Sequence, residues 1–294
     1  MRNILVVTGG AGFIGSNLVS ELLKFNKFKV LSIDNYSSGL SKNHIKNKRV
    51  KYLKGNTKNI EVLLKSYTGK IHGIFHFGEF ARIYQSFKKI DECFSSNIEG
   101  SANVFKFALK NRIRLIYSAT SASLGNKGED MNLSPYAFSK AKNLELLENF
   151  KKWFNFRYEV IYFYNVYGER QICKGDMATV VGIFEDHFKK RKKLPVVRPG
   201  TQVRRFTHVY DTTKACIFAW RKNKCKHYSI ANKESYSILE LAKMFECKIR
   251  YLPKREGERF ASALTKMNLD NKIIRLGAKI KLRDYIKKFL INNH

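Results

Sequence analysis

The feature that most constrains this chain is a glycine-rich loop between a short apolar run and a helix-like segment. Residues 3–8 are apolar and β-branched, which predicts a buried strand. The sequence GGAGFIG (9–15) follows at once, and a helical pattern runs from Phe13 to about Phe25. Gly9 allows a tight turn, Gly12 lets the backbone approach a pyrophosphate, and Gly15 allows close helix packing. The loop therefore predicts a dinucleotide-binding site at the amino end of that helix.

A carboxylate follows the second predicted strand. Residues 30–33 form that strand and Asp34 ends it, about 20 residues beyond the glycine loop. A carboxylate in this position hydrogen-bonds the adenosine ribose hydroxyls and repels a 2′-phosphate. Asp34 therefore favours NAD over NADP as the cofactor.

Strand-like and helix-like segments alternate through the first half of the chain. Such alternation indicates βαβ units with right-handed crossovers and a parallel sheet. We predict strands at 71–76, 113–118 and 160–164, and helices at about 93–110 and 135–153. The predicted fold class is α/β, a Rossmann-type doubly wound parallel sheet.

The alternation weakens after Asn165. Helical patterns at about 178–190, 211–220, 237–245 and 283–290 flank a short extended piece at 194–197. We predict an NAD-binding Rossmann domain over residues 1–165 and a smaller C-terminal substrate-binding α/β lobe over 166–294. Part of 200–232 is expected to return to the Rossmann domain. A lobe placed in this way covers the carboxyl ends of the strands, where open α/β sheets bind ligands.

Two residues on the predicted helix 135–153 suggest hydride-transfer chemistry. Tyr136 and Lys140 are four positions apart, so their side chains share one helix face. A phenol with a pKa near 10 is a poor base at neutral pH, but a neighbouring cation favours the phenolate. The strand before the helix ends in SATS (118–121), whose hydroxyls could share a proton with the phenol and a substrate oxygen. A YxxxK pair on its own is common by chance, and only the preceding strand end with its hydroxyl groups makes a catalytic role credible.

Composition narrows the class of protein further. The five cysteines form no CxxC pair and their number is odd, which argues against a zinc site or a disulfide framework. That pattern fits a reducing compartment. No apolar run approaches the roughly 20 residues of a membrane span. We therefore expect a cytoplasmic protein with no metal site and no membrane contact.

The net charge of +32 is the one compositional extreme. A positive field attracts polyanions, including nucleic acid. The lysines are nevertheless scattered along the chain, and the one dense run, 189–193, fits the end of a helix, where cations suit the dipole. An anionic small substrate explains the sign of the charge equally well, so a nucleic-acid partner is not favoured.

At this point the chain resembles the extended short-chain dehydrogenases/reductases, and among them the sugar-nucleotide epimerases related to UDP-glucose 4-epimerase. The resemblance covers almost the full length. It is carried by TGGAGFIGSNL (8–18), IDNYSSG (33–39), NIEGSANVFKFA (97–108), YSATSASLG (117–125), SPYAFSK (134–140), YFYNVYGERQ (162–171), GTQVRRFTHVYDTTKA (200–215) and PKREGE (253–258).

The resemblance implies a role for each matching residue. Tyr136 is the implied catalytic base, Lys140 holds the nicotinamide ribose, and Thr120 takes the Ser/Thr place. The implied cofactor-binding residues are Gly9, Gly12, Phe13, Ile14, Gly15, Asp34, Asn35, Ser38, Gly39, Asn56, Thr57, Phe77, Gly78, Glu79, Ser118, Tyr136, Lys140 and Tyr164. The implied substrate-binding residues are Thr120, Tyr136, Asn165, Val197, Arg204 and Arg255.

Four departures from the family pattern bear on the reaction. The 4,6-dehydratases carry Thr-Asp-Glu where this chain has TSA (120–122), so elimination lacks its acid and base unless Glu79 or Glu129 substitutes. Nucleotide-sugar decarboxylases usually carry a glutamate here too. The loop 125–135 is about ten residues shorter than in UDP-glucose 4-epimerases. Arg205 replaces an aspartate beside Arg204, and Asn56 replaces an aspartate near the adenine.

The resemblance favours NAD-dependent 4-epimerisation of a nucleotide sugar, a UDP-hexose, through a transient 4-keto sugar. The alternatives are a 4-ketoreductase or dehydrogenase of a nucleotide deoxysugar, and a non-catalytic NAD-binding scaffold associated with RNA. A homodimer is also implied, with the helices around 93–110 and 136–153 pairing in a four-helix bundle. Apolar contacts could come from Phe105, Phe107, Leu109, Leu144 and Leu147, although an internal core explains several of these side chains as well.

Overall fold

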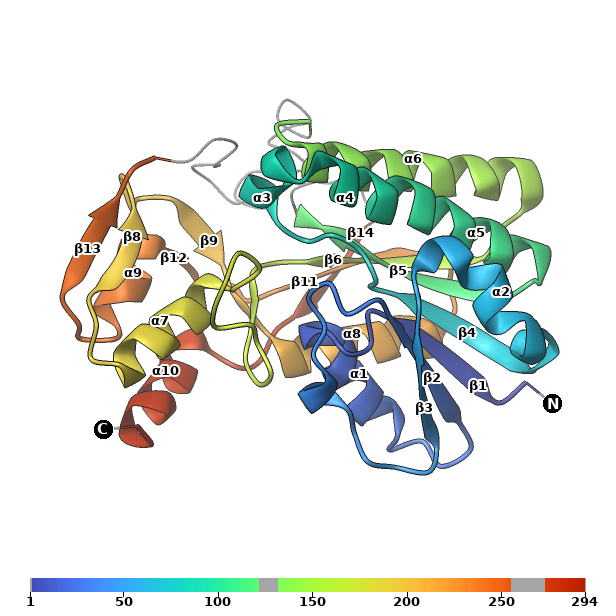
Figure 1. Cartoon of the computed structure of the whole chain (residues 1–294), viewed down its shortest axis with the longest axis horizontal. Helices are drawn as coiled ribbons and strands as arrows, with labels where there is room; N and C mark the ends of the chain where they lie inside the picture. Colours follow the sequence, from blue (N-terminus) through green and yellow to red (C-terminus); the bar gives the residue numbers. More distant parts are fainter. Residues whose placement is uncertain (1, 122–131, 255–272, 294) are drawn as a thin grey trace.

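An eight-stranded parallel sheet forms the centre of the molecule (Figure 1). The computed structural model describes residues 2–121, 132–254 and 273–293. The strands run in the order β14-β11-β6-β5-β4-β1-β2-β3. Their bounds are β1 (Ile4–Thr8), β2 (Lys29–Asp34), β3 (Val50–Lys54), β4 (Ile71–His76), β5 (Arg114–Thr120), β6 (Tyr158–Phe163), β11 (His227–Ala231) and β14 (Ile273–Gly277).

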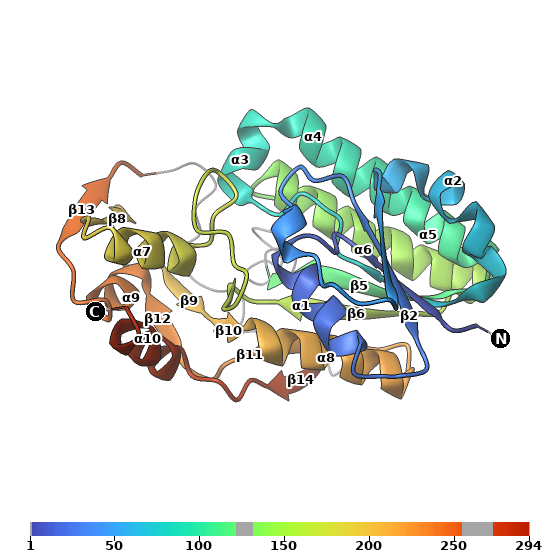
Figure 2. The ribbon, with the colours of Figure 1, turned by 60° about the horizontal axis from the view of Figure 1, so that its bottom comes forward.

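Helices cover both faces of this sheet, as the views in Figures 1 and 2 show. One face carries α2 (Ile60–Leu64), α3 (Ile83–Lys88), α4 (Ile90–Phe94), α5 (Ser101–Lys110) and α6 (Pro135–Phe154). The other carries α1 (Phe13–Leu22) and α8 (Val209–Lys222). Short 3₁₀ helices are η1 (Ser41–Asn43), η2 (Thr57–Asn59) and η3 (Lys65–Lys70), and a π-helical turn, η4 (Ser95–Gly100), joins α4 to α5. The predicted doubly wound α/β class is confirmed.

Strand β1 shows why the sheet is buried on both faces. Its residues alternate between the two hydrophobic cores: Ile4 and Val6 pack with α5 and α6, whereas Leu5 and Val7 pack with α1 and α8. Successive side chains of a strand point to opposite faces, so a strand covered twice must be apolar throughout. This is the continuous apolar run that the sequence displays.

The strand order reverses between β1 and β4. From β1 the chain builds outward through β2 and β3, and from β4 it builds in the opposite direction through β5 and β6. The carboxyl ends of β1 and β4 therefore part at the middle of the sheet. Open α/β sheets bind ligands at such a switch point, and the glycine loop follows β1 directly.

A smaller lobe lies beyond the carboxyl ends of the strands (Figure 1). Its core packs aromatic and aliphatic residues such as Phe184, Phe245 and Leu241. Its elements are α7 (Val180–Lys189), β8 (Leu194–Val197), β9 (Val203–Arg205), β12 (Ser235–Ser237), α9 (Ile238–Lys243), β13 (Ile249–Leu252) and α10 (Leu282–Ile291). The short parallel pair β7 (Val166–Tyr167) and β10 (Thr207–His208) lies next to β6 and α8 in sequence.

Five apolar side chains proposed for a dimer contact lie inside the molecule or against its core. Phe105, Phe107 and Leu147 are buried in the core beneath α5 and α6, and Leu109 and Leu144 pack against it. These residues therefore stabilise the fold of one chain. In the described part of the chain, no helix has the length and apolar character that crossing a bilayer requires.

Candidate active site

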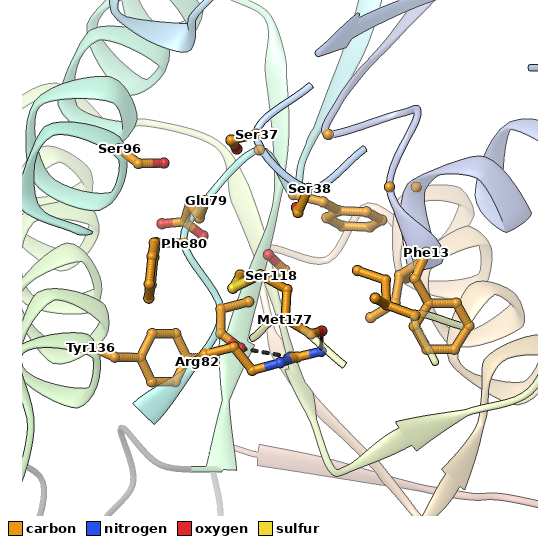
Figure 3. A pocket seen from close by; sticks show the side chains of 18 of the residues that line it. Phe13, Ser37, Ser38, Glu79, Phe80, Arg82, Ser96, Ser118, Tyr136 and Met177 are labelled. Atoms are coloured by element: carbon orange, nitrogen blue, oxygen red, sulfur yellow. Dashed lines mark hydrogen bonds between the residues drawn. The ribbon is translucent and has the colours of Figure 1, made fainter. Parts of the chain in front are cut away.

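A cavity of about 570 Å³ opens at the switch point of the sheet. Its lining includes the glycine loop, Asp34, Thr120, Tyr136 and Lys140. Figure 3 shows Phe13, which begins α1, and Tyr136, which projects from α6, on opposite sides of this space. The predicted cofactor residues and the predicted catalytic residues thus border one cavity.

The glycine loop adopts a form that side chains would prevent. Gly9 has a positive φ of 70°, and a Cβ there would lie 2.8 Å from the carbonyl oxygen of Phe77. A Cβ at Gly15 would lie 2.1 Å from the carbonyl oxygen of Gly9. The backbone consequently turns tightly against the end of β4 and passes close to α1.

Helix α1 begins beside this loop with its amino end free. Gly12 is the N-cap residue and supplies no capping side chain, and the first turn holds no acidic residue. Unsatisfied N–H groups and the positive end of the helix dipole bind phosphate well. The residues of this loop therefore fit the pyrophosphate of a dinucleotide.

Asp34 lies at the carboxyl end of β2 with its carboxylate held in place. Its Oδ2 accepts a hydrogen bond from the Ala11 N–H at 3.0 Å, and its Oδ1 accepts one from the Tyr36 N–H at 2.8 Å. A Cβ at Gly39 would lie 2.6 Å from Oδ1, so that glycine leaves room for the carboxylate. Burial raises the pKa of Asp34, and hydrogen bonding to the backbone N–H groups of Tyr36, Ala11 and Gly12 opposes that rise. The fixed carboxylate at the cavity wall fits a ribose with free hydroxyls, as in NAD.

Tyr136 lies in the first turn of α6. Pro135 precedes it, and the Ser134 hydroxyl caps the helix by accepting a hydrogen bond from the Ala137 N–H at 3.1 Å. Both features favour a helix start here. Burial raises the pKa of Tyr136 to about 12, a hydrogen bond with Thr120 lowers it, and the negative charge of Glu79 raises it again.

Lys140 is buried one turn further along α6 and pairs with a carboxylate. Its Nζ forms an ion pair with Oε2 of Glu79 and donates a hydrogen bond to the backbone oxygen of Ser118. Only 4% of its side chain is exposed. Burial lowers the pKa of Lys140, and Glu79 opposes that change. An ammonium group has three N–H donors, so one remains for a ligand in the cavity.

Glu79 is held from several elements at once. Its Oε1 accepts hydrogen bonds from Ser101 Oγ at 2.8 Å, Tyr117 Oη at 3.0 Å and Asn143 Nδ2 at 3.1 Å. Only 3% of its side chain is exposed. Glu79 is thus engaged by Lys140 and by these three donors, which argues against a role as the missing dehydratase acid. Glu129 lies outside the described residues.

The structure corrects the expectation for Tyr164. Its side chain is fully buried in the core beside α6 and does not line the cavity, whereas Phe163 does. Neighbouring residues at the end of a strand point to opposite faces, so Phe163 occupies the place expected for Tyr164.

Three further predicted residues do not line the cavity, although most of those predicted do. Asn56 caps η2, where its Oδ1 accepts from the Lys58 N–H at 2.9 Å, and Gly55 and Thr57 line the cavity instead. Gly39 lies against the Asp34 carboxylate, where a larger residue would collide with it. Val197 pairs with β13 in the small lobe. Arg255 lies outside the described residues.

Two arginines next to each other on β9 point in different directions. Arg204 lines the cavity. Arg205 instead donates to the backbone oxygen of Asn232 at 3.1 Å, and its own backbone oxygen accepts from Asn165 Nδ2 at 2.9 Å. Asn165 also lines the cavity. Arg204 and Asn165 thus border the cavity, while Arg205 is engaged with Asn165 and with the residue that follows β11.

Two segments that no motif indicated complete the cavity wall. Residues 80–85 follow β4, and residues 175–179 precede α7. Arg82 joins them, since its Nη2 donates to the backbone oxygen of Met177 (Figure 3). Met177 also packs against a small apolar cluster that includes Phe80 and Tyr136. Residues 80–82 and 175–179 lie outside helices and strands, and residues 83–85 form the first turn of the short helix α3. Segments this short carry no clear periodic signal, and so the sequence did not indicate them.

Comparison with known proteins agrees with this geometry. Residues 5–231 match the model of a family described as NAD dependent epimerase/dehydratase. A protein assigned as a UDP-glucose 4-epimerase in Methanocaldococcus jannaschii is 29% identical over 271 residues, covering 87% of each chain. A UDP-N-acetyl-alpha-D-glucosaminuronate decarboxylase from Bacillus cytotoxicus is 29% identical over 262 residues, covering 82% of this chain and 79% of that protein.

Solved structures with a similar fold are also known. The UDP-N-acetylglucosamine 4-epimerase of Methanobrevibacter ruminantium M1, in complex with UDP-N-acetylmuramic acid, superimposes with a TM-score of 0.83 at 26% sequence identity. The match covers 99% of this chain and 97% of that chain.

Proposed function

This chain belongs to the NAD dependent epimerase/dehydratase family, and from that premise we propose that it catalyses 4-epimerisation of a nucleotide sugar, a UDP-hexose, through a transient 4-keto sugar. One observation carries the proposal above the others. Tyr136, hydrogen-bonded to Thr120, and Lys140 border the same cavity as a glycine loop that accepts a dinucleotide.

Each residue of the site has a distinct role in this reaction. NAD bound at the glycine loop and Asp34 would take up a hydride from C4 of the sugar and return it. As the phenolate, Tyr136 accepts the proton of the C4 hydroxyl, with the Thr120 hydroxyl sharing that proton. Lys140 holds the nicotinamide ribose with its remaining N–H. Arg204 and Asn165 hold the substrate diphosphate, for which a guanidinium offers a planar pair of donors.

The end of strand β5 distinguishes this reaction from related ones. A relative of equal identity is a decarboxylase, so overall similarity does not select the chemistry. Dehydration needs an acid and a base on the sugar, and positions 121 and 122 are serine and alanine. Glu79 is committed to Lys140. Reversible oxidation at C4, which needs only Tyr136 and Thr120 beside the cofactor, is the chemistry that these residues support.

The expected partners are a nucleotide-sugar substrate and a second copy of the chain. Ile90 on α4 and Trp153 and Phe154 on α6 are exposed apolar side chains on the helices expected to pair, and they support a four-helix bundle. The five cysteines are all free, which supports a cytoplasmic protein. Residues 1–165 and 166–294 remain the proposed cofactor and substrate regions, although β11 and β14 belong to the central sheet and α8 packs on it.

A panel of sugars tests this function directly. The purified protein is incubated with UDP-, GDP-, dTDP- and CDP-sugars, and the configuration at C4 is followed by NMR. Interconversion of a UDP-hexose pair without added cofactor is the expected result. Turnover that consumes one cofactor per sugar would indicate a ketoreductase or dehydrogenase. Salt-sensitive RNA binding without any sugar turnover would indicate a non-catalytic scaffold.

A further inference from the structure

Arg82 places a positive charge beside the predicted catalytic tyrosine. It lines the same cavity as Tyr136 and Thr120, and Figure 3 shows its side chain extending past the Tyr136 ring towards Met177. Its charge is close enough to lower the pKa of Tyr136. Arg82 is half-buried, and burial lowers its pKa.

The guanidinium has no acidic partner among the residues that the structure describes. Its Nη1 donates to the backbone oxygen of Ala81 at 2.7 Å, and its Nη2 donates to the backbone oxygen of Met177. Its Nε is buried and has no hydrogen-bond partner. A guanidinium has five N–H donors, and only two of those of Arg82 are donated to residues within 2–121, 132–254 and 273–293.

The acidic residues of the cavity wall do not neutralise this charge. Asp34 accepts from two backbone N–H groups at the cofactor end, and Glu79 is paired with Lys140. Asp176 is exposed and forms no ion pair with Arg82. A half-buried cation without a counter-ion is unfavourable, and an anionic ligand would supply that counter-ion.

We propose that Arg82 binds a carboxylate carried by the sugar itself, so that the preferred substrates are nucleotide hexuronates rather than neutral hexoses. The inference rests on the proposed function and names its substrate class. The diphosphate is assigned to Arg204, which comes from the small lobe, whereas Arg82 lies beside the side chain that acts on the sugar. The planar guanidinium fork matches a carboxylate with two parallel hydrogen bonds.

Binding measurements test this assignment independently of catalysis. The full chain is titrated calorimetrically with UDP-glucuronate, UDP-glucose and UDP. The unmodified protein is expected to bind UDP-glucuronate about 10- to 100-fold more tightly than UDP-glucose. Arg82→Gln, which keeps a neutral hydrogen-bond donor, is expected to remove that preference and to leave the affinity for UDP unchanged.

Three variants serve as controls. Arg204→Gln should weaken all three ligands by a similar factor, because it removes a diphosphate contact. Asp176→Asn should leave the preference for UDP-glucuronate intact. Arg82→Lys keeps the charge without the fork and should show an intermediate preference, which also provides a measurement if Arg82→Gln does not fold.

The proposal is overturned if Arg82→Gln weakens UDP and both sugars equally, since Arg82 would then hold the diphosphate. It is also overturned if the unmodified protein binds the two sugars equally. Arg82-dependent binding of UDP-glucuronate without interconversion at C4 would contradict the epimerase function and leave the inference standing. Epimerisation of neutral sugars that Arg82→Gln does not affect would support the epimerase function and overturn the inference about Arg82.

Discussion

The ion pair between Glu79 and Lys140 leads to the most quantitative prediction. Both side chains are at least 96% buried, with exposed fractions of 3% and 4%. Removing one partner of a buried pair leaves an uncompensated charge and costs about 3–5 kcal/mol. No reduction for solvent screening is needed at this depth. We therefore expect Glu79→Gln and Lys140→Met each to lower the free energy of unfolding by that amount.

The double variant distinguishes the cost of an unpaired buried charge from the cost of the other contacts that the substitutions remove. Glu79→Gln with Lys140→Met leaves no buried charge, and the amide can still accept hydrogen bonds from Ser101, Tyr117 and Asn143. The remaining cost is an unsatisfied polar group, such as the backbone oxygen of Ser118, which is about 1–3 kcal/mol. The double variant should thus be more stable than either single variant.

Thermal unfolding followed by circular dichroism at one fixed scan rate is a suitable assay. Each single variant should lose roughly 6–10 °C, at about 2 °C for each kcal/mol in a chain of this size. The double variant should recover at least half of that loss. If the effects of the two substitutions simply add, the two charges do not interact in solution and the reasoning is refuted.

Four other perturbations test the cofactor and catalytic assignments. Tyr136→Phe should lower kcat about 10²- to 10⁴-fold with nearly unchanged substrate affinity, and initial rates within tenfold of the original would exclude it as the base. Because the pKa of Tyr136 is raised to about 12 and the phenolate is the active form, kcat/KM should rise between pH 6 and pH 9; a flat profile would contradict this. Asp34→Ala should weaken NAD binding about 10- to 100-fold and reduce the discrimination against NADP, as measured by fluorescence titration; unchanged discrimination would argue against the ribose contact. Gly15→Ala should abolish cofactor retention, because its Cβ would lie 2.1 Å from a carbonyl oxygen, whereas Gly69→Ala, with nothing within 4 Å, should retain the cofactor normally.

The sequence was most informative where a local rule determines the structure. The buried strand β1, the glycine loop and the start of α6 at Pro135 follow from apolar runs, positive φ and helix capping, and each lies where predicted. The helix predicted over about 93–110 is present but interrupted by the π-helical turn η4. Side-chain periodicity averages over such a turn and cannot reveal it.

The sequence was least informative where tertiary contacts determine the position of a strand or a side chain. Strand β3 lies at the edge of the sheet, where Lys51 and Lys54 are exposed and no residue is fully buried, so the segment has no strong apolar signal. Phe163 lines the cavity and the neighbouring Tyr164 is buried in the core, because adjacent side chains of a strand face opposite sides of the sheet. The ion pair between Glu79 and Lys140 joins residues that are 61 positions apart in the sequence. Arg82 reaches Met177 across 95 positions. No spacing rule connects such pairs.

The central claim is that a hydride leaves C4 of the sugar and returns to it within one cavity. The most direct test uses a C4-deuterated UDP-hexose that the NMR panel identifies as a substrate. The label should be retained at C4 in the epimerised product, with no net change in cofactor redox state. Loss of the label to solvent, or release of one reduced cofactor for each sugar converted, would contradict the account.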